Sequence, residues 1–433
     1  MLYPHLAVNE QHHLTIGGLD TLSIAREYGT PCYVLDENVI RSRCRVYREA
    51  CAEAFGPKAL PLFASKALCF TGMYKIMAEE GLGIDCVSGG ELYTAEKAGF
   101  PSDHIYFHGN NKTDADLKQA VGMHVGTIVV DGFDELEALE TICAAAGTRQ
   151  RILLRIAPGI DPHTFRAVRT GSVDSKFGTA IQTGQALEIV RKALSLPHID
   201  LAGCHCHIGS QIFETQPFRD AAAIMVAFLV QIRKDCGVTL SELNLGGGPG
   251  VPYTQDDPSI DYRSFVTELG VIVRSVCESE NFPVPSVRIE PGRSIVADAG
   301  LTLYTVGGVK EIPGFKNYIS VDGGMPDNPR YALYQSRYTA LIADRADEPK
   351  TYTATLAGRC CESGDLIGEN MPIQKARRGD ILAVLCTGAY NYSMASHYNR
   401  LPNPPVVLVR DGKTRLGVRR ETYADLTALD QEI

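Results

Sequence analysis

The sequence predicts an α/β fold: a closed, TIM-like (β/α)8 barrel followed by a mainly antiparallel C-terminal β domain, a sandwich or barrel. Between residues 61 and 293, short β-rich runs alternate with amphipathic helix-like stretches, a pattern typical of parallel sheets with crossover helices. Beyond about Ser294 the β-rich runs follow one another directly, as in antiparallel sheets. Eight alternating units match a barrel of ~250 residues, and a doubly wound open sheet is the alternative, because counting units does not establish closure.

The elements are expected in the following order. Residues 1–35 are predicted to be extended and turn-rich, with a short helix near 21–28 and a strand at 32–37, and a helix follows at 38–55. The eight barrel strands are expected at 61–67, 83–88, 104–109, 127–131, 151–158, 200–209, 242–248 and 286–293. The helices between them include 91–99, 134–147, 184–196 and 262–279.

The second domain is predicted from five further β-rich runs, at 302–312, 317–324, 350–358, 380–390 and 404–421. Asp411-Gly412 is a hairpin signal inside the last run. We expect the barrel to occupy residues 36–295. Residues 1–35 and 296–433 then form the β domain, with the N-terminal strand joining it.

Composition excludes several classes of protein. Lys and Arg number 42 against 51 Asp and Glu, a net charge of -9, which argues against binding nucleic acid through phosphate neutralisation. No apolar run reaches membrane-spanning length, and the N-terminal residues lack the pattern of a secretion signal. Thirteen cysteines without regular spacing fit reduced thiols, so a cytoplasmic location is expected.

Lys66 follows the first predicted barrel strand, in the stretch PLFASKA. Burial disfavours an ammonium ion, so a lysine at the end of a buried strand is either one that reaches solvent or a neutral amine. A neutral amine can form an imine with a carbonyl cofactor. Lys66 alone leaves both interpretations open.

Polar residues gather at the carboxyl ends of the other predicted strands, where barrel enzymes place their functional groups. These residues are Asp85, Ser88, His108, Arg155, His205, His207, Ser210, Gly246, Gly247, Gly248, Glu290 and Arg293. The three glycines suit a phosphate cradle, because backbone amides can approach an anion closely there, although a flexible turn is equally compatible. Glu290 suits a partner for a pyridine nitrogen, or an ion pair with Arg293.

The run Cys204-His205-Cys206-His207 resembles a metal-binding sequence only superficially. Neighbours on a strand point to opposite faces, and no second ligand cluster has suitable spacing. No metal is therefore expected. His207 could stack on a flat cofactor or be a hydrogen-bonded core histidine.

The second domain has three candidate stretches. In GRCCESGD, Cys361 beside Glu362 could be an exposed proton donor or an inert thiol. Arg330 and Tyr334 would share one face of a helix. Tyr390 stands beside a glycine in GAYNYSMAS.

Taken together, these motifs resemble the fold-type III decarboxylases that use pyridoxal 5'-phosphate (PLP), especially those that act on diaminopimelate. The motifs are FASKA, DCVSGGEL, HGNNK, SKFG, HIGSQ, GGGPG, EPGR, CESGD and GAY, in family order between residues 14 and 400. The family fold is a barrel with a C-terminal β domain, which agrees with the pattern described above.

The resemblance implies a role for each matching residue. Lys66 would hold PLP as an imine, and Cys361 would donate the proton, supplied across a homodimer interface. The cofactor would contact Lys66, Asp85, Arg155, His207, Ser210, Gly246, Gly247, Gly248, Glu290, Pro291, Gly292, Arg293 and Tyr390. The substrate would contact Arg293, Arg330, Tyr334, Glu362 and Tyr390.

The implied reaction is decarboxylation of meso-2,6-diaminopimelate to L-lysine and CO2. Asn328, Pro329, Tyr331, Arg359 and Cys360 depart from the usual family pattern near the substrate end. The alternatives are therefore a decarboxylase of ornithine, arginine or carboxynorspermidine, and a non-catalytic PLP-binding protein. Glu290 argues against an amino-acid racemase. A carboxylate keeps the pyridine ring of the cofactor protonated, which favours full electron withdrawal, whereas a racemase is expected to restrain it with an arginine partner.

Overall fold

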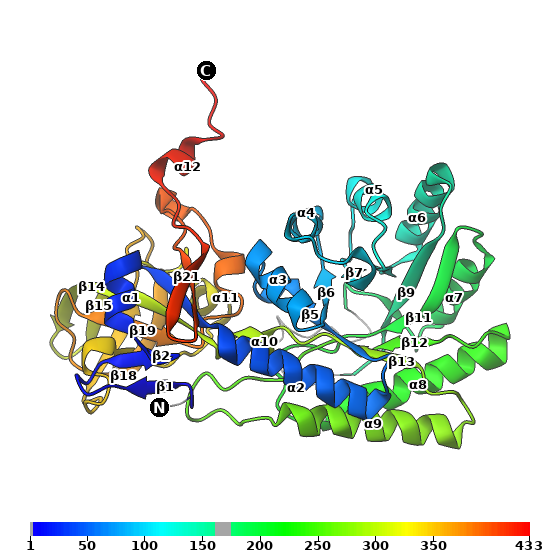
Figure 1. The fold of residues 1–433 in the computed structure, drawn as a ribbon, viewed down its shortest axis with the longest axis horizontal. Coiled ribbons are helices and arrows are strands. Elements are labelled where there is room, and N and C mark those ends of the chain that lie inside the picture. The colour runs from blue at the N-terminus through cyan, green and yellow to red at the C-terminus, as the bar shows by residue number, and fades with distance from the viewer. Residues whose placement is uncertain (1–2, 161–174) are drawn as a thin grey trace. The chain divides into compact units, whose positions relative to one another are not determined.

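A computed structural model of the protein describes residues 3–160 and 175–433 (Figure 1). The chain forms two compact units. Unit 1 comprises Met1–Ser42, Val251–Pro258 and Arg293–Ile433, and unit 2 comprises Arg43–Gly250 and Ser259–Gly292. Met1 and Leu2 lie outside the described residues.

Unit 2 is a closed barrel of eight parallel strands. They are β5 (Leu60–Ala64), β6 (Gly83–Cys86), β7 (Ile105–Phe107), β8 (Thr127–Val130), β9 (Gln150–Ala157), β11 (Ile199–His205), β12 (Glu242–Asn244) and β13 (Ser286–Ile289). Each strand pairs with the next, and β13 returns to pair with β5, so the barrel closes. The short β10 (Thr179–Ala180) also pairs with β9. The predicted barrel is confirmed and the open sheet is wrong.

Helices connect the strands on the outside of the barrel (Figure 1). They are α2 (Glu37–Phe55), α3 (Thr71–Glu79), α4 (Gly89–Ala98), α5 (Asp114–Gly122), α6 (Phe133–Ala146), α7 (Gln185–Ser195), α8 (Gln216–Cys236) and α9 (Tyr262–Ser279). Local sequence fixes their ends: Ser88 and Thr113 cap the starts of α4 and α5, and Gly99 ends α4 in a left-handed conformation.

The inside of the barrel is packed with side chains from several of its strands. Leu62, Tyr106, Val129, Leu153 and Ala202 form one buried layer. A packed interior leaves the loops at the strand ends as the place for chemistry.

Unit 1 is built on β strands, as predicted. Its main sheet and the strands paired with it comprise β4 (Cys32–Asp36), β14 (Gly300–Ile312), β15 (Lys316–Val321), β16 (Ala340–Ile342), β17 (Tyr352–Ala357), β18 (Leu366–Ile373), β19 (Ile381–Leu385), β20 (Val406–Arg410) and β21 (Lys413–Val418). The N-terminal strand β4 pairs with β14 and β20, so it joins this sheet as expected. Two pairs, β4–β20 and β15–β17, are parallel, and the others are antiparallel.

Smaller elements complete unit 1. A three-stranded sheet contains β1 (Leu6–Val8), β2 (Leu14–Ile16) and β3 (Leu19–Asp20). The helices are α1 (Thr21–Tyr28), α10 (Arg293–Val296), α11 (Arg330–Tyr334) and α12 (Tyr423–Thr427). Asp411 and Gly412 both have positive φ between β20 and β21, which confirms the hairpin predicted there.

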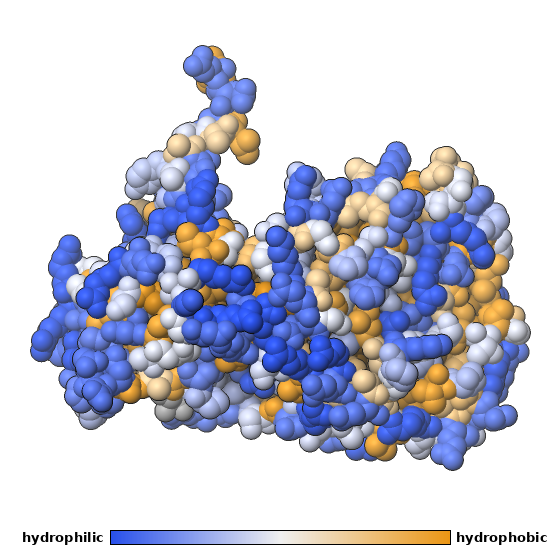
Figure 2. Space-filling view, in the orientation of Figure 1, coloured by the Kyte–Doolittle hydropathy of each residue, from blue (hydrophilic) through white to orange (hydrophobic). Residues whose placement is uncertain are grey.

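Of the helices in residues 3–160 and 175–433, none is long and apolar enough to cross a membrane. Figure 2 shows hydrophilic residues over most of the visible face, with hydrophobic residues scattered among them.

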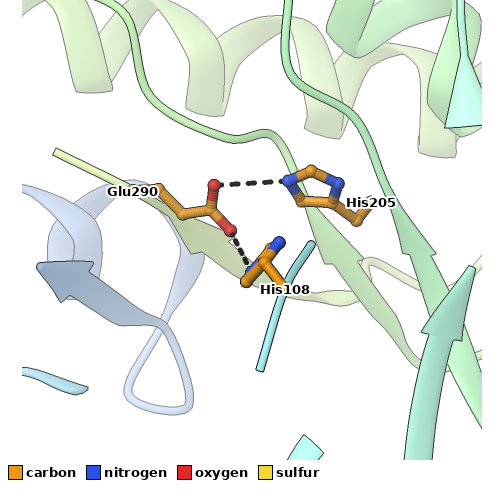
Figure 3. Close-up of side chains that lie close together, drawn as sticks. All are labelled: His108, His205 and Glu290. Carbon is orange, nitrogen blue, oxygen red and sulfur yellow. Dashed lines mark hydrogen bonds and ion pairs between the residues drawn. The ribbon is translucent and has the colours of Figure 1, made fainter. Parts of the chain in front are cut away.

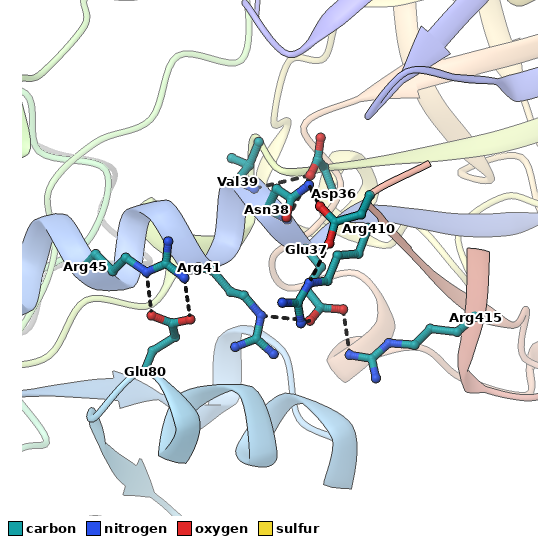
Figure 4. A network of polar contacts seen from close by, with 10 residues as sticks. Asp36, Glu37, Asn38, Val39, Arg41, Arg45, Glu80, Arg410 and Arg415 are labelled. Atoms are coloured by element: carbon teal, nitrogen blue, oxygen red, sulfur yellow. Dashed lines mark hydrogen bonds and ion pairs between the residues drawn. The ribbon is translucent and has the colours of Figure 1, made fainter. Parts of the chain in front are cut away.

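A buried carboxylate joins the start of α2 to the last hairpin within unit 1 (Figure 4). Glu37 is fully buried, and its oxygens accept hydrogen bonds from Arg41 at 2.8 Å, Arg410 at 3.1 Å and Arg415 at 2.6 Å. Burial disfavours the charge, but the hydrogen bonds from Arg41 and Arg415 prevail and lower the pKa of Glu37. The ionised form therefore stabilises the fold.

We expect Glu37→Ala to lower the free energy of unfolding by about 2 kcal/mol at pH 7, because it leaves three guanidinium groups without their shared carboxylate. The pKa of Glu37 is lowered in the folded state, so its contribution is present above the unfolded carboxyl pKa of about 4.3 and is lost as the pH falls further. Urea unfolding at pH 7 and pH 3 measures both effects.

Glu53→Ala is the matched control, since Glu53 forms an exposed ion pair with Arg263 and its loss should cost under about 0.5 kcal/mol. Equal losses from the two variants would show that the Glu37 cluster contributes no more than a surface pair.

Candidate active site

The carboxyl ends of the barrel strands hold most of the predicted residues of unit 2. The strands are shorter than the predicted runs: β11 ends at His205, β12 at Asn244 and β13 at Ile289. His207, Ser210, Gly246–Gly248 and Glu290 consequently lie in the loops that follow. Loops carried by a rigid barrel are where this fold places its chemistry.

Lys66 lies just beyond β5, in a short 3-10 turn formed by Ser65–Ala67. Ser65 and Ala67 are buried, but Lys66 is exposed. The hypothesis that burial makes Lys66 neutral is therefore wrong, because Lys66 is not buried. The charge of Lys66 acts on the pKa of Asp85 and of His207, so this exposed residue lies at the carboxyl end of the barrel, where its amine suits a carbonyl compound.

The three glycines after β12 lie against backbone from two neighbouring loops. A Cβ on Gly247 would be 2.0 Å from the Glu290 carbonyl oxygen, and one on Gly248 would be 2.2 Å from the Gly209 oxygen. Gly248 also has a φ of +123°, which favours glycine. No larger residue fits these positions, so the turn brings the loops after β11, β12 and β13 together.

Glu290 lies at the centre of a buried polar cluster (Figure 3). Its Oε1 is 2.7 Å from Asn244 Nδ2 and 3.0 Å from His108 Nε2, and its Oε2 is 3.3 Å from His205 Nε2. Burial disfavours the charge, yet His108 and His205 lower the pKa of Glu290 well below its usual value. Burial lowers the pKa of His205 to about 4, so at neutral pH a neutral imidazole donates its N–H to an ionised carboxylate.

Asp85 and Arg155 lie beside this cluster and are largely buried. Asp85 Oδ1 is 4.0 Å from His108 Nε2, and burial raises the pKa of this carboxyl. The Arg155 guanidinium stacks on Phe177 with 4.3 Å between its central carbon and the ring centroid. Arg155 Nε is also 3.8 Å from an oxygen of Asp131. The barrel thus brings Asp85 and Arg155 to the same end as Glu290.

His207 is held by the glycine turn. The Gly247 N–H donates to His207 Nδ1 at 3.3 Å, which leaves Nε2 to carry the ring proton. Burial, together with Lys66 and Arg155, lowers the pKa of His207 well below its usual value. The ring is therefore neutral and suited to stacking on a flat, charged cofactor.

Unit 1 holds the second group of predicted residues, built around Tyr390. The guanidinium carbons of Arg293 and Arg330 lie 4.6 and 5.4 Å from the centroid of its ring. Arg330 also lies 5.2 Å from the ring of Tyr334, which confirms that these two residues share a face of α11. Arg293 donates to the Tyr253 hydroxyl at 2.7 Å. Two buried cations on one tyrosine form a site for an anion.

The proton-donor candidate lies in an exposed turn before β18. Cys361 and Glu362 are both exposed, and the Cys361 N–H donates to Asn399 at 2.8 Å. Burial, together with Asp365, raises the pKa of the neighbouring Cys360 to about 12, so Cys360 stays a thiol. Exposure makes Cys361 the more accessible of the two.

Asp365 fixes this turn against the segment before α11. Its oxygens accept the N–H groups of Met325 at 2.5 Å and Cys360 at 2.7 Å. It also lies so close to Gly324 and Gly358 that a Cβ on either would be within 2.3 Å of it. The turn that carries Cys361 and the segment that precedes Arg330 are therefore held together by one buried carboxylate.

Asn328, Pro329 and Tyr331, which depart from the family pattern, are all accommodated in or next to α11. Pro329 is the N-cap residue of α11, Tyr331 donates to Glu369 at 2.7 Å, and Asn328 is fully buried. Helix α11 forms with Arg330 at its start in spite of these departures.

The sequence placed His108 and His205 among the polar residues at the strand ends without giving them a role, and it did not single out Asn244 or Asp365. His108 and His205 end or follow predicted strands, which was the available signal. Their meeting at Glu290 joins residues 85 or more positions apart, which no local pattern reveals.

Comparison with known proteins decides the family. The domain described as "Pyridoxal-dependent decarboxylase, pyridoxal binding domain" matches residues 38–297. The chain belongs to the pyridoxal-dependent decarboxylases. It is a PLP-dependent carboxy-lyase, as the motifs indicated.

Individual pyridoxal-dependent decarboxylases resemble it over nearly their whole length. The diaminopimelate decarboxylase of Bacillus subtilis is 47% identical over 98% of this chain and 96% of its own. A crystal structure of diaminopimelate decarboxylase from M. jannaschii with L-lysine has a TM-score of 0.91 and 31% identity, covering 100% and 99% of the two chains. A lysine/ornithine decarboxylase from Vibrio vulnificus shares the fold, with a TM-score of 0.75 at 24% identity over 90% of this chain and 97% of that one.

The residues at the barrel end fit the PLP of this decarboxylase family. The accessible amine of Lys66 suits its aldehyde, the neutral ring of His207 suits its flat face, and the ionised Glu290 suits a protonated pyridine nitrogen. The glycine turn leaves a cradle that any Cβ would fill.

We expect Gly247→Ala to weaken PLP binding by at least about tenfold, since its methyl group would displace the Glu290 backbone and every loop that touches it. Titration of the PLP-free protein with PLP, followed by absorbance, measures the affinity. Gly122→Ala is the matched control, because a Cβ there meets nothing within 4 Å. Unchanged affinity in Gly247→Ala would contradict the cradle.

Proposed function

We propose that the protein removes the carboxylate from the D-centre of meso-2,6-diaminopimelate, giving L-lysine and CO2 in the last step of lysine biosynthesis. The relatives support this substrate, since the Bacillus subtilis diaminopimelate decarboxylase matches nearly the full chain. The observation that carries the proposal is the buried Arg330 beside Tyr334 and Tyr390.

PLP, when bound, supplies an aldehyde that captures the substrate amine and a ring that withdraws electrons from the bond that breaks. In our proposal Lys66 binds the cofactor covalently through its accessible amine and yields that place to the substrate. His207 stacks on the ring, and Asp85 and Arg155 set the charge around the lysine and the cofactor edge.

We propose the remaining cofactor contacts as follows. Glu290 holds the proton on the ring nitrogen, because it is ionised and buried. The phosphate is bound by residues of the loops after β11, β12 and β13: Ser210, Gly246, Gly247, Gly248, Pro291, Gly292 and Arg293. Tyr390 also contacts the cofactor in our proposal.

Arg330 distinguishes the substrate from its competitors. Its guanidinium is only 7% exposed, and its Nε has no hydrogen-bond partner among residues 3–160 and 175–433. A buried guanidinium without an anion is costly, and a carboxylate can satisfy it through two parallel hydrogen bonds. Diaminopimelate carries a distal carboxylate, whereas ornithine ends in an ammonium alone.

The other substrate contacts complete the distal end in our proposal. Arg293 and Tyr390 flank the same carboxylate position, Tyr334 closes it, and the exposed carboxylate of Glu362 meets the distal ammonium. The substrate site thus needs a cation and an anion together, which a diamine precursor does not offer.

Cys361 is the proposed proton donor to the carbon that loses CO2. Its exposure in the single chain is compatible with a site completed by a second copy, so we propose a homodimer with shared active sites. We also propose a cytoplasmic location, supported by thirteen cysteines without regular spacing and by the biosynthetic relatives.

The substrate is tested by decarboxylation of diaminopimelate, ornithine, arginine and lysine. Arg330→Ala should lower kcat/KM for diaminopimelate by about a hundredfold or more, because the distal carboxylate loses its charged partner, while the PLP absorbance persists. Arg337→Ala is the control, since Arg337 forms an exposed ion pair with Asp256. If the unaltered protein prefers ornithine or arginine, the substrate assignment is wrong.

The proton donor and the shared site are tested together. Cys361→Ala should bind PLP and substrate but turn over ~10²–10⁴-fold more slowly, as expected for a lost general acid. Mixing it with Lys66→Ala protein should restore part of the activity through mixed dimers. The control is Cys236→Ala, whose activity should be unchanged. No restoration after proven subunit exchange would refute sharing between subunits.

A further inference from the structure

A single carboxylate is enough to face a ring nitrogen, but Glu290 is surrounded by several further polar side chains. Five strands of the barrel contribute to it: Asp85 is on β6, His108 follows β7, His205 ends β11, Asn244 ends β12 and Glu290 follows β13. His108, His205 and Glu290 are at most 7% exposed. Their arrangement within the barrel end is shown in Figure 3.

The two carboxylate oxygens of Glu290 are not equivalent. Oε1 has two close partners, Asn244 Nδ2 at 2.7 Å and His108 Nε2 at 3.0 Å. Oε2 has His205 Nε2 at the longer distance of 3.3 Å. Oε1 therefore has the two nearer protein groups, a hydrogen bond from Asn244 and the close imidazole of His108, whereas Oε2 has only His205 among the described residues and retains capacity for another donor.

The partners of Glu290 are themselves held in place. Asn244 Oδ1 accepts the Gly246 N–H at 2.9 Å, which fixes the amide so that its NH2 points at Glu290. The His108 backbone N–H donates to the Cys86 carbonyl at 2.7 Å. The rings of His108 and His205 pack edge to face, with centroids 4.8 Å apart and an interplanar angle of 71°.

We propose that His108 and His205 are positioning residues that keep Glu290 ionised and turn its Oε2 toward the ring nitrogen of PLP. The inference rests on the proposed function, in which Glu290 faces that nitrogen. His108, with Asn244, occupies Oε1 and blocks rotation of the carboxylate. His205 supplies a donor to Oε2 that offsets the cost of burying the charge.

The same three side chains offer donor atoms within 4.8 Å of one another, which is also the arrangement of a metal site. Two observations favour the positioning role. Asn244 already donates to Oε1 at 2.7 Å, and His205 Nε2 lies at hydrogen-bond distance, 3.3 Å, from Oε2. A divalent ion at this position would be an outcome of the test below.

The experiment compares PLP with its analogue in which carbon replaces the ring nitrogen. Both are titrated into protein freed of PLP, and the ratio of their affinities measures the contribution of the ring nitrogen. His108→Phe and His205→Phe should each lower this ratio by about tenfold, as expected for a lost hydrogen bond to a charged group, with affinity for the analogue unchanged. His108→Gln and His205→Gln keep an N–H donor and should retain most of the ratio.

Two further variants calibrate the measurement. Glu290→Gln should abolish the preference for PLP over the analogue. His198→Phe is the matched control, because His198 pairs with Glu140 at 2.7 Å on the barrel exterior, and the ratio should not change.

The outcomes separate the two hypotheses. If Glu290→Gln leaves the ratio unchanged, Glu290 does not face the ring nitrogen, and the proposed role of Glu290 fails. If Glu290→Gln removes the preference for PLP over the analogue while all His108 and His205 variants keep that preference, the positioning inference alone is overturned. A divalent metal bound one per chain in the PLP-free protein would overturn it as well.

A second measurement covers the case in which the phenylalanine variants do not fold. The infrared carboxylate band of the PLP-free protein, assigned by comparison with Glu290→Gln, should show Glu290 ionised at pH 7 in the unaltered protein. It should show partial protonation in the His108→Ala/His205→Ala double variant, where neither N–H donor remains. A fully ionised Glu290 in that double variant would contradict the inference.

Discussion

The buried carboxylate of Glu290 at the end of the barrel determines which side chains must surround it. A carboxylate removed from water is costly unless hydrogen bonds replace its solvation. Glu290 meets that requirement with Asn244, His108 and His205, each from a different strand end. The closed barrel is what makes this possible, because only closure brings the carboxyl ends of β7, β11, β12 and β13 around a common axis.

The turn formed by Gly246–Gly248 is packed against the same buried carboxylate residue. Asn244, which holds Glu290, also holds Gly246, and Gly247 packs directly on the Glu290 backbone. His207 accepts the Gly247 N–H. The loops after β11, β12 and β13 are therefore one packed unit, and each depends on the absence of side chains at the turn.

Much of the fold could be predicted because its signals are local. The change from β-rich runs to amphipathic stretches located all eight barrel strands, and Asp411-Gly412 located the last hairpin. Closure could not be predicted from the count alone, because it depends on β13 meeting β5 across more than 200 residues. The strand ends were placed too late, since glycine and histidine at the carboxyl ends continue the apolar pattern into the loops.

The site divides in the same way. Lys66, Glu290 and the three glycines could be found because their residue types suit the chemistry at those strand ends. The exposure of Lys66 could not, because it depends on a 3-10 turn that buries Ser65 and Ala67 instead. His108 and His205 could be placed at the strand ends, but their contact with Glu290, and that of Asn244, could not be predicted, because it joins residues distant in the chain.

Asp365 limits which residues can be substituted in the turn that carries Cys361 and in the segment before α11. Its carboxylate is enclosed by Gly324 and Gly358 and takes the N–H groups of Met325 and Cys360. A side chain at either glycine would displace the carboxylate, and a shorter side chain at 365 would leave two amides unsatisfied. These positions must therefore change together or not at all, which makes them a poor target for single-site engineering of specificity and leaves the exposed residues of the turn as the freer choice.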